Sequence, residues 1–299
     1  MIFALTKARD GPSAGRSRTV LGFGILAFVA MLAALHPVLQ ATVWASQANV
    51  YHPEVGFDIQ VAHPSGFSAR HPLGTDPLGR DVLSQLTFAL RPTLLVVVAS
   101  AVTVAVLGTV AGAAAAFWRG KTEAALTHLS DAMALLPPSL AMLVVGVGRP
   151  DFGPTELGVL YGAIFGLGPG AAAIRAQGLL VMAQPFMDAA RTAGGGGWWN
   201  VRKHLFPHLL PLVAVQVASA VIGAIVVEGF IEYLGAAQTR LGLGSLVYAA
   251  ITYQRVLRTG VPWYALLAGT AAITLLVAAF YMISTGLREA FDPRLRNVT

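Results

Sequence analysis

"MDAARTAGGGGWWNVRKHLFPHLLP", residues 187–211, interrupts an apolar sequence with a run of glycines, two adjacent tryptophans and an Arg-Lys-His cluster. Alanine and arginine before the glycines favour helix, and the glycines permit a sharp change of direction. The prolines at 207 and 211 are compatible with the first turn of a new helix. The stretch therefore predicts a helix, a hinge and a second helix, placed between two apolar segments.

The composition around this stretch is that of a membrane protein. Of 299 residues, 56% are hydrophobic and only 11% are charged, whereas soluble domains carry about 25% charged residues. About 20 apolar residues are needed to cross a hydrocarbon core as a helix, and the runs here lack the alternation of barrel strands. We predict an all-α integral membrane protein with six transmembrane helices. The charge-free runs are Val20–Leu39, Pro92–Trp118, Ala132–Gly148, Leu157–Ile174, Leu209–Val227 and Val261–Leu287.

These runs divide the chain into segments and suggest an orientation. The first span, 20–40, exceeds the apolar core of a secretory signal, so we expect it to be retained. Positively charged residues concentrate in cytoplasmic loops, and most of the 20 Lys and Arg fall there if both termini are cytoplasmic. The net charge of +6 is then a topology signal and no nucleic-acid partner is expected. The expected segments are a basic start 1–19, the first span 20–40, an extracytoplasmic segment 41–91, five spans within 92–287, and a cytoplasmic tail 288–299.

The extracytoplasmic segment ends in a helical pattern that begins at Asp81. Apolar residues recur there at helical spacing, with polar residues between them. This pattern predicts an amphipathic helix on the membrane surface before the chain turns inward at Pro92. The helix is expected either to anchor the second span or to contact substrate. Its apolar residues are Val82, Leu83, Leu86 and Leu90, and its polar ones are Ser84, Gln85 and Thr87.

Several patterns associated with enzymes or cofactors are incomplete. The "RGKT" at 119–122 resembles the end of a phosphate-binding loop, but that motif needs glycine at position 115, where this chain has alanine. His52, His63 and His71 lack the close spacing of a metal site, and we expect them to be solvated loop residues. The chain has no cysteine and no recognisable nucleophile turn. We therefore expect no metal, no cofactor and no catalytic residue in this chain.

Three acidic residues lie within or beside the spans. Burying a charge in lipid costs at least about 2.5 kcal/mol, so each needs a polar environment. Asp131 begins the third span, and Glu228 and Glu232 close the fifth on one helix face. Two interpretations stay open. The glutamates either hydrogen-bond neighbouring helices or line a translocation pathway or its gate.

The opening stretch resembles a known family motif. "DAARTAGGGGWWNVRKHLFP" is similar to the EAA loop of ABC-importer permeases, in which E-A-A, a glycine and a late proline recur at fixed spacing. Here Asp188-Ala189-Ala190, Gly194 and Pro207 stand at that spacing, with Lys203-His204 before the proline. Three more stretches resemble dipeptide and oligopeptide permease C subunits. These are "HPLGTDPLGRDVLSQL" at 71–86, "EGFIEYLG" at 228–235 and "GLREAFDPRLRN" at 286–297.

The resemblance implies a fold, partners and a mechanism. The fold would be the type I ABC-importer permease fold in the cell membrane. The chain would pair with a second, homologous permease, two ATPase subunits and an extracytoplasmic binding protein, and ATP and magnesium would bind only in the ATPases. A coupling loop, 185–208, would transmit ATPase motion, while Arg202 and Lys203 snorkel at the membrane surface. The implied coupling residues are Asp188, Ala189, Ala190, Arg191, Gly194, His204 and Pro207.

Departures from the family pattern leave the substrate open. Asp188 replaces the usual glutamate, and residues 195–197 are glycines. The stretch "AAQTRLGLGS" at 236–245 stands where the family pattern has a proline-rich stretch. A peptide, nickel or a metal chelate would each fit this architecture. Two further classes are an ion-coupled secondary transporter, which would need an inverted repeat that the spans do not show, and a membrane assembly protein without transport.

Overall fold

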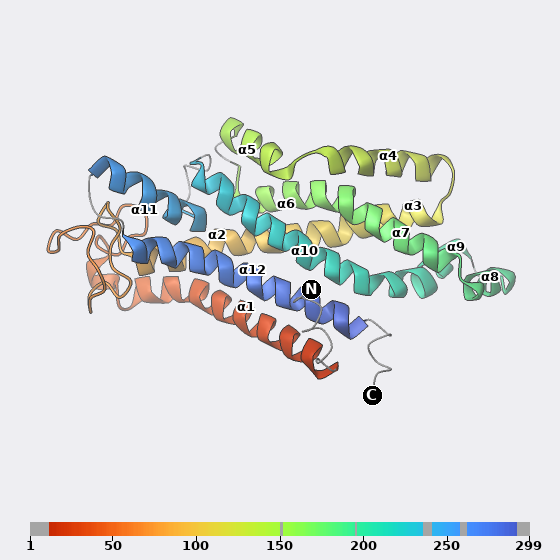
Figure 1. Ribbon diagram of the computed structural model, residues 1–299, viewed down its shortest axis with the longest axis horizontal. Coiled ribbons are helices and arrows are strands. Elements are labelled where there is room, and N and C mark those ends of the chain that lie inside the picture. Colours follow the sequence, from red (N-terminus) through yellow and green to blue (C-terminus); the bar gives the residue numbers. More distant parts are fainter. Residues whose placement is uncertain (1–11, 150–151, 195, 236–240, 258–261, 292–299) are drawn as a thin grey trace, which may run out of the picture.

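The apolar runs fold into long helices, because a segment that crosses lipid must pair its own backbone polar groups. In the computed structural model the described residues are 12–149, 152–194, 196–235, 241–257 and 262–291, and these form an elongated helical bundle (Figure 1). The helices are α1 Pro12–Ala41, α2 Val82–Thr103, α3 Thr109–Phe117, α4 Lys121–Leu135, α5 Pro138–Gly148, α6 Pro154–Phe165, α7 Ala171–Met182, α8 Pro185–Thr192, α9 Gly197–Asn200, α10 Phe206–Tyr233, α11 Leu243–Leu257 and α12 Trp263–Phe291.

Within the described residues, 5 helices are long and apolar enough to cross a membrane, or 6 if one bent pair is one span. Short π-helical stretches join α2 to α3, α6 to α7, and α9 to α10 into single spans. The bent pair is α4 and α5, which meet at 74°. Pro138 starts α5, and each proline of the Pro137–Pro138 pair biases the residue before it away from helix, so that Leu136 and Pro137 are both extended. The predicted spans are therefore confirmed, with the third one broken.

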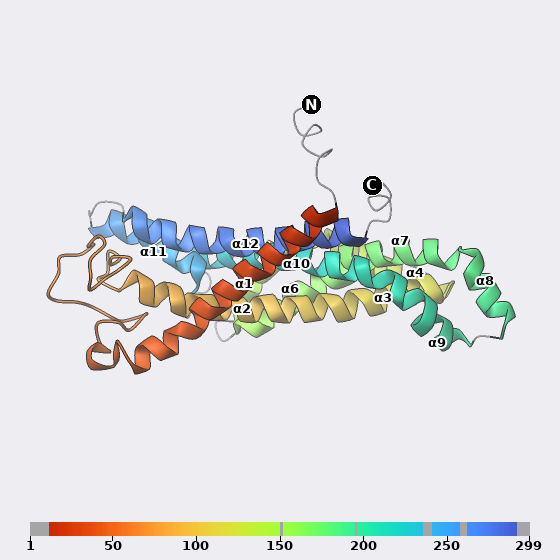
Figure 2. The same cartoon turned by 90° about the horizontal axis from the view of Figure 1, so that it is seen from below.

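Close helix packing holds the bundle together. α1 lies along α12, α2 along α6, and α3 along α7, while α10 contacts α2, α11 and α12 (Figure 2). Gly112 of α3 shows why small residues matter, since a Cβ there would lie 2.7 Å from the Ala171 carbonyl oxygen of α7. The largest buried cluster joins α1, α2, α10, α11 and α12.

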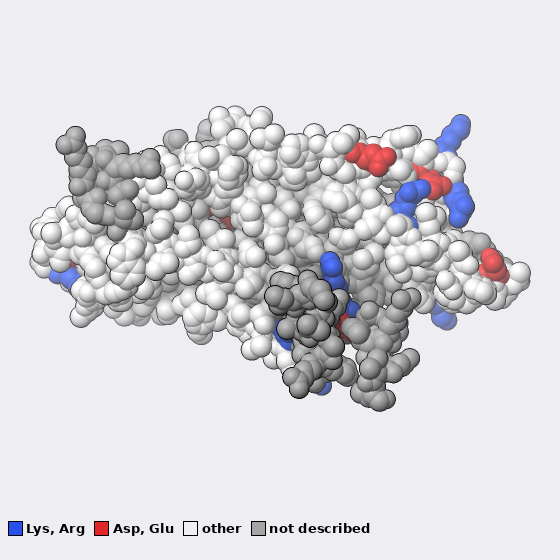
Figure 3. All heavy atoms as spheres, viewed as in Figure 1, with Lys and Arg blue, Asp and Glu red and all other residues white. Residues whose placement is uncertain are grey.

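The two ends of the bundle differ. Residues 42–81 and α11 lie at one end, and α8 and α9 lie at the other (Figures 1 and 2). In the face shown in Figure 3, Lys and Arg gather towards the α8 end together with several Asp and Glu, and further Lys and Arg lie beside the chain termini. The sequence-based division into a loop-rich segment before the five-span region thus has a counterpart in space. The predicted basic start and tail lie partly outside the described residues.

The predicted surface helix is wrong in one respect. Residues 82–91 are the first part of α2, which continues through Pro92 to Thr103 without a turn. Its polar face points inward, because the Ser84 hydroxyl donates to the Tyr51 carbonyl and the Gln85 amide donates to Asp76. Asp81 caps the helix by accepting the Ser84 N–H at 2.7 Å. The polar stripe that resembled a water-facing surface is therefore the packing face for residues 42–81.

Candidate coupling and pathway sites

α8 lies across one end of the bundle and presents its two faces differently (Figure 2). Met187 is 0% exposed and packs in a cluster with Val181 of α7 and Leu205 before α10. Ala190 is also buried, whereas Asp188 and Ala189 are exposed. The predicted Asp-Ala-Ala motif thus places one alanine against the bundle and leaves Asp188 and the other alanine on the outer surface.

Gly194 follows α8 and has a φ of +82°. A Cβ added there would meet nothing within 4 Å, so the requirement for glycine comes from the left-handed backbone and not from space. Gly196 has ordinary extended angles, φ −62° and ψ 155°. Gly197 packs closely, since a Cβ there would lie 3.2 Å from the Phe117 ring. Gly195 lies outside the described residues.

Aromatic and histidine side chains join α8 to the start of α10. Phe186 stacks on His208 with ring centroids 5.3 Å apart, and His204 meets Trp199 edge-on at 5.0 Å. The Lys203 ammonium lies 5.1 Å from the Trp199 ring centroid. Of the predicted coupling residues, His204 belongs to this joint and Pro207 lies in the first turn of α10. The Arg191 side chain lies outside the described residues.

Sequence reasoning missed the two residues that attach this loop to the bundle. Met187 and Leu205 are both 0% exposed, yet neither belongs to the family motif. The available signal was spacing: Met187 stands three positions before Ala190 and therefore shares its helix face. The attachment of α8 is thus hydrophobic, and Asp188 and Thr192 remain on the exposed side.

Glu228 and Glu232 lie inside the packed chain. They are 3% and 6% exposed, and Glu232 Oε2 accepts the Gly244 N–H at 2.8 Å. Gly244 belongs to the first turn of α11, where a carboxylate pairs with unsatisfied backbone N–H groups and the positive end of the helix dipole. Glu232 therefore links α10 to α11. This arrangement favours the interpretation in which the glutamates hydrogen-bond neighbouring helices.

Two substitutions of Glu232 distinguish two roles: holding α11 against α10, and supplying a charge in the translocation pathway. Glu232→Gln keeps an acceptor for the Gly244 N–H, so we expect uptake within about threefold of wild type, the scale of a charge lost from a helix N-terminus. Glu232→Ala leaves that buried N–H unpaired, at a cost of about 1–3 kcal/mol. Thermal unfolding and uptake are measured together. A strong loss of uptake in Glu232→Gln with unchanged stability would show that the charge acts in the pathway.

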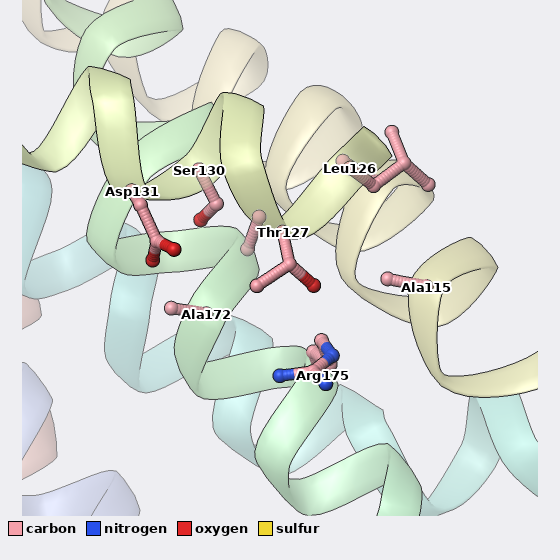
Figure 4. A pocket seen from close by; sticks show the side chains of 9 residues that line it. Ala115, Leu126, Thr127, Ser130, Asp131, Ala172 and Arg175 are labelled. Carbon is pink, nitrogen blue, oxygen red and sulfur yellow. The ribbon is translucent and has the colours of Figure 1, made fainter. Parts of the chain in front are cut away.

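Asp131 lies on α4 and is exposed, beside a small pocket between α3, α4 and α7. Figure 4 shows Asp131, Ser130 and Thr127 of α4 facing Ala172 and Arg175 of α7 across this space. The pocket volume is about 40 Å³. The structure does not bring Asp131 together with Glu228 and Glu232, which lie on α10.

Comparison with known proteins gives this arrangement a family. The family described as "Binding-protein-dependent transport system inner membrane component" matches residues 106–297, from the π-helical stretch before α3 past the end of α12. The chain belongs to this family of importer permeases. The permease is therefore a multi-pass membrane protein with the type I ABC-importer permease fold, as predicted, and its family acts in transport as the membrane component.

Curated relatives span most of the permease. The oligopeptide transport system permease protein OppC of Haemophilus influenzae is 30% identical over 230 residues, 76% of this chain and 71% of that protein. The di/tripeptide transport system permease protein DppC of Pseudomonas aeruginosa is 29% identical over 273 residues, 87% and 86% of the two chains. The glutathione transport system permease protein GsiD of Pectobacterium atrosepticum is 26% identical over 273 residues, 90% and 88%.

At its other end the permease contains a buried charge cluster. His71 is 0% exposed, its Nδ1 lies 2.9 Å from Asp81 Oδ2, and its Nε2 lies 3.2 Å from Asp58 Oδ2. Arg70 Nε lies 2.7 Å from the same Asp58 oxygen. The prediction of solvated loop histidines is therefore wrong for His71. His63 is also held in place, with its Nδ1 2.9 Å from the Thr75 hydroxyl oxygen.

The two carboxyl groups of this cluster respond differently to burial. Burial raises the pKa of Asp81 above its ordinary value, despite hydrogen bonds from His71 and the Ser84 N–H. Burial acts in the same direction on Asp58, but the Gln60 N–H, His71 and Arg70 outweigh it and lower the pKa of Asp58. As pH falls, the stability that charged Asp58 contributes starts to be lost below the ordinary pKa of an aspartate and is gone below its lowered pKa. Asp81 behaves in the opposite way. The stability that its proton contributes is present at low pH and is lost as pH rises through its raised pKa.

Removing His71 tests whether this cluster holds residues 42–81 against α2. His71→Ala leaves two buried carboxyl groups without their shared partner, so we expect a loss of about 3–5 kcal/mol. The measurement is thermal unfolding together with limited proteolysis of the purified protein, with His52→Ala as the control because His52 is exposed. Equal melting of the two variants would mean that the cluster contributes nothing to stability.

Proposed function

We propose that this permease is one half of the translocation pathway of an ATP-driven importer for di- and oligopeptides. A second, homologous permease would supply the other half, two ATPase subunits would bind on the cytoplasmic side, and a binding protein would deliver substrate outside. The names of the relatives, which include oligopeptide, di/tripeptide and glutathione transport systems, support short peptides as substrates.

The proposed orientation places α8 and α9 in the cytoplasm and residues 42–81 outside. Its support is the gathering of Lys and Arg towards the α8 end of the bundle in Figure 3, as the positive-inside rule requires of cytoplasmic segments. In this orientation the chain termini are cytoplasmic. The buried cluster around His71 then stabilises the part of the molecule that faces the binding protein.

The observation that carries the proposed coupling is the two-sided placement of α8. Its inner side is attached through Met187 and Ala190, and its outer side presents Asp188 and Ala189. A short amphipathic helix on a folded base is suited to the groove of a soluble partner. We assign ATPase contact to Asp188, Ala189 and Arg191, the seating of the coupling helix on the bundle to Ala190, the hinge to Gly194, and the joint with α10 to His204 and Pro207. Trp198, 73% exposed, lies beside this surface.

The pathway assignment separates the three acidic residues. Asp131 is exposed on the broken span α4–α5 and is proposed to face the aqueous route. Glu228 and Glu232 are proposed to act at the outer gate by holding α11 against α10, and not by contact with substrate. Movement of α11 would then change access at that end of the bundle.

Reconstitution of the full complex tests this function. The permease is co-expressed with the second permease, ATPase and binding protein of the same organism, purified, and placed in liposomes. We expect uptake of labelled di- or oligopeptide that requires ATP and the binding protein. Uptake that follows an ion gradient without an ATPase would support a secondary transporter instead, and uptake of nickel without peptide would move the substrate to the metal class.

A further inference from the structure

The pocket between α3, α4 and α7 has a carboxylate that no residue described by the structure neutralises. Its polar lining consists of Thr127, Ser130 and Asp131 of α4 and Arg175 of α7, with alanines on the remaining walls (Figure 4). A volume of about 40 Å³ holds a few water molecules or one small charged group. It is too small for a whole peptide, so any substrate would enter it by one end group only.

One carboxylate at the pocket, that of Asp131, has no charged partner among the described residues. Arg175 Nη2 lies 2.6 Å from Glu123 Oε1, which pairs these two charges. The Ser130 hydroxyl donates to the Gly168 carbonyl at 2.7 Å. Asp131 makes no hydrogen bond or ion pair with any residue that the structure describes. Because Glu123 already pairs with Arg175, Asp131 is the charged lining residue without a partner among the described residues, and its carboxylate is available to a cation.

The position of Asp131 within its span calls for polar surroundings. The helix from Lys121 to Asp131 rises roughly 15 Å, about half of the roughly 30 Å hydrocarbon core. An exposed carboxylate at this depth is strongly disfavoured against lipid, so it faces a water-filled cavity or a polar partner. His128, also exposed, precedes it by three positions and shares this face. The α4 surface is therefore polar where the span would otherwise meet lipid.

We propose that this pocket binds the primary ammonium group of a substrate during translocation, with Asp131 as its counter-charge. The proposal rests on the proposed function. Short peptides carry such a group at the N-terminus or on a lysine side chain. An ammonium group has three donors and no acceptor. Asp131 offers two charged acceptor oxygens, and the Thr127 hydroxyl, which donates to the Glu123 carbonyl, retains lone pairs. Arg175 of α7, which pairs with Glu123, lies on the opposite wall.

The first experiment measures whether the pocket is wet. The natural chain has no cysteine, so a single cysteine reports only its own position. Ala172→Cys is placed in the exposed pocket lining, and Met31→Cys, on the apolar helix α1 and 60% exposed, is the lipid-facing control. In the reconstituted complex we expect a charged, membrane-impermeant thiol reagent to label Ala172→Cys at least about tenfold faster, because thiolates form in water and not in apolar surroundings. Equal slow labelling would overturn the proposal.

The second experiment measures the ammonium group itself. Labelling of Ala172→Cys is repeated with Ala-Ala, N-acetyl-Ala-Ala and N-acetyl-Lys-Ala, each at millimolar concentration. We expect protection by Ala-Ala and none by N-acetyl-Ala-Ala. Protection by N-acetyl-Lys-Ala would show that a side-chain ammonium serves as well as the terminal one. In Ala172→Cys with Asp131→Asn we expect the protection to disappear, whereas Glu156→Asn, which changes an exposed carboxylate on α6, should leave it intact.

Three results would overturn the proposal: equal protection by Ala-Ala and N-acetyl-Ala-Ala, protection that survives Asp131→Asn, or protection by sodium chloride alone. The last would assign the pocket to a monovalent cation. Because labelling needs no transport, it is read separately from peptide uptake. A complex without ATP-driven peptide uptake would refute the proposed function, whereas a wet pocket without ammonium protection in a working peptide importer would refute only this inference.

Discussion

Gly194→Val is expected to abolish most ATP-driven uptake while the protein still inserts and assembles. Gly194 has a φ of +82°, a conformation that costs about 1–2 kcal/mol for a residue with a Cβ and more for a β-branched one. Relief of this strain turns the chain after α8 and displaces the helix from the ATPase surface. We expect at least about a tenfold fall in uptake, the factor that corresponds to 1.4 kcal/mol, measured in proteoliposomes against the amount of assembled complex.

Gly196→Val is the matched control for this change. Gly196 has angles that valine adopts, and a Cβ there would meet nothing within 4 Å. We expect nearly normal uptake from this variant. The account of the hinge fails if both variants transport equally, or if Gly196→Val is the more damaging one. Equal losses in both variants, or a larger loss in Gly196→Val, would show that the glycine run matters for its flexibility as a whole, and normal uptake in both would show that Gly194 is no hinge.

Met187→Ala is expected to uncouple ATP hydrolysis from transport. Met187 is the side chain of α8 that enters the cluster of α7 and α10. Truncation of a fully buried methionine costs about 2–5 kcal/mol, and a helix as short as α8 has few other contacts that could retain its position. We expect the assembled complex to keep hydrolysing ATP while uptake falls strongly. The measurement is the ratio of peptide taken up to ATP consumed.

Met142→Ala separates this effect from a general loss of stability. Met142 is also 0% exposed but belongs to α5 and to a different buried cluster. Its truncation should lower the melting temperature by a similar amount and leave the ratio of uptake to ATP consumed nearly unchanged in complexes that remain assembled. A similar fall of that ratio in both variants would mean that Met187 has no special part in coupling.

The spans and the helix–turn–helix at 185–208 were predictable because their signals are local. An uninterrupted apolar run of this length is stable in lipid as a helix. The spacing from Asp188 to Pro207 is contained in one stretch of sequence. The break of the third span follows from Pro137 and Pro138, but its 74° angle depends on packing against α6 and the stretch before α7. The attachment of α8 through Met187 likewise depends on residues that are distant in sequence.

Residues 41–91 show where local pattern misleads. The polar stripe of Ser84, Gln85 and Thr87 has the spacing of a water-facing surface, yet all three are buried against residues that precede them in the chain. A histidine between loops gave no sign that Asp58 and Asp81 would enclose it. Periodicity identifies the face of a helix, but it does not say whether the polar face meets water or another folded segment.

Cross-linking from single cysteines tests the central claim, that α8 couples to the ATPase while residues 42–81 face the other side. Ala189→Cys and Val55→Cys are both exposed, and the chain offers no competing cysteine. In membranes that contain the complete importer, each variant is treated with a short bifunctional reagent. We predict a cross-link from Ala189→Cys to the ATPase and none from Val55→Cys to that subunit. A cross-link from Val55→Cys to the ATPase, or modification of Ala189→Cys by an impermeant reagent outside intact cells, would contradict the account.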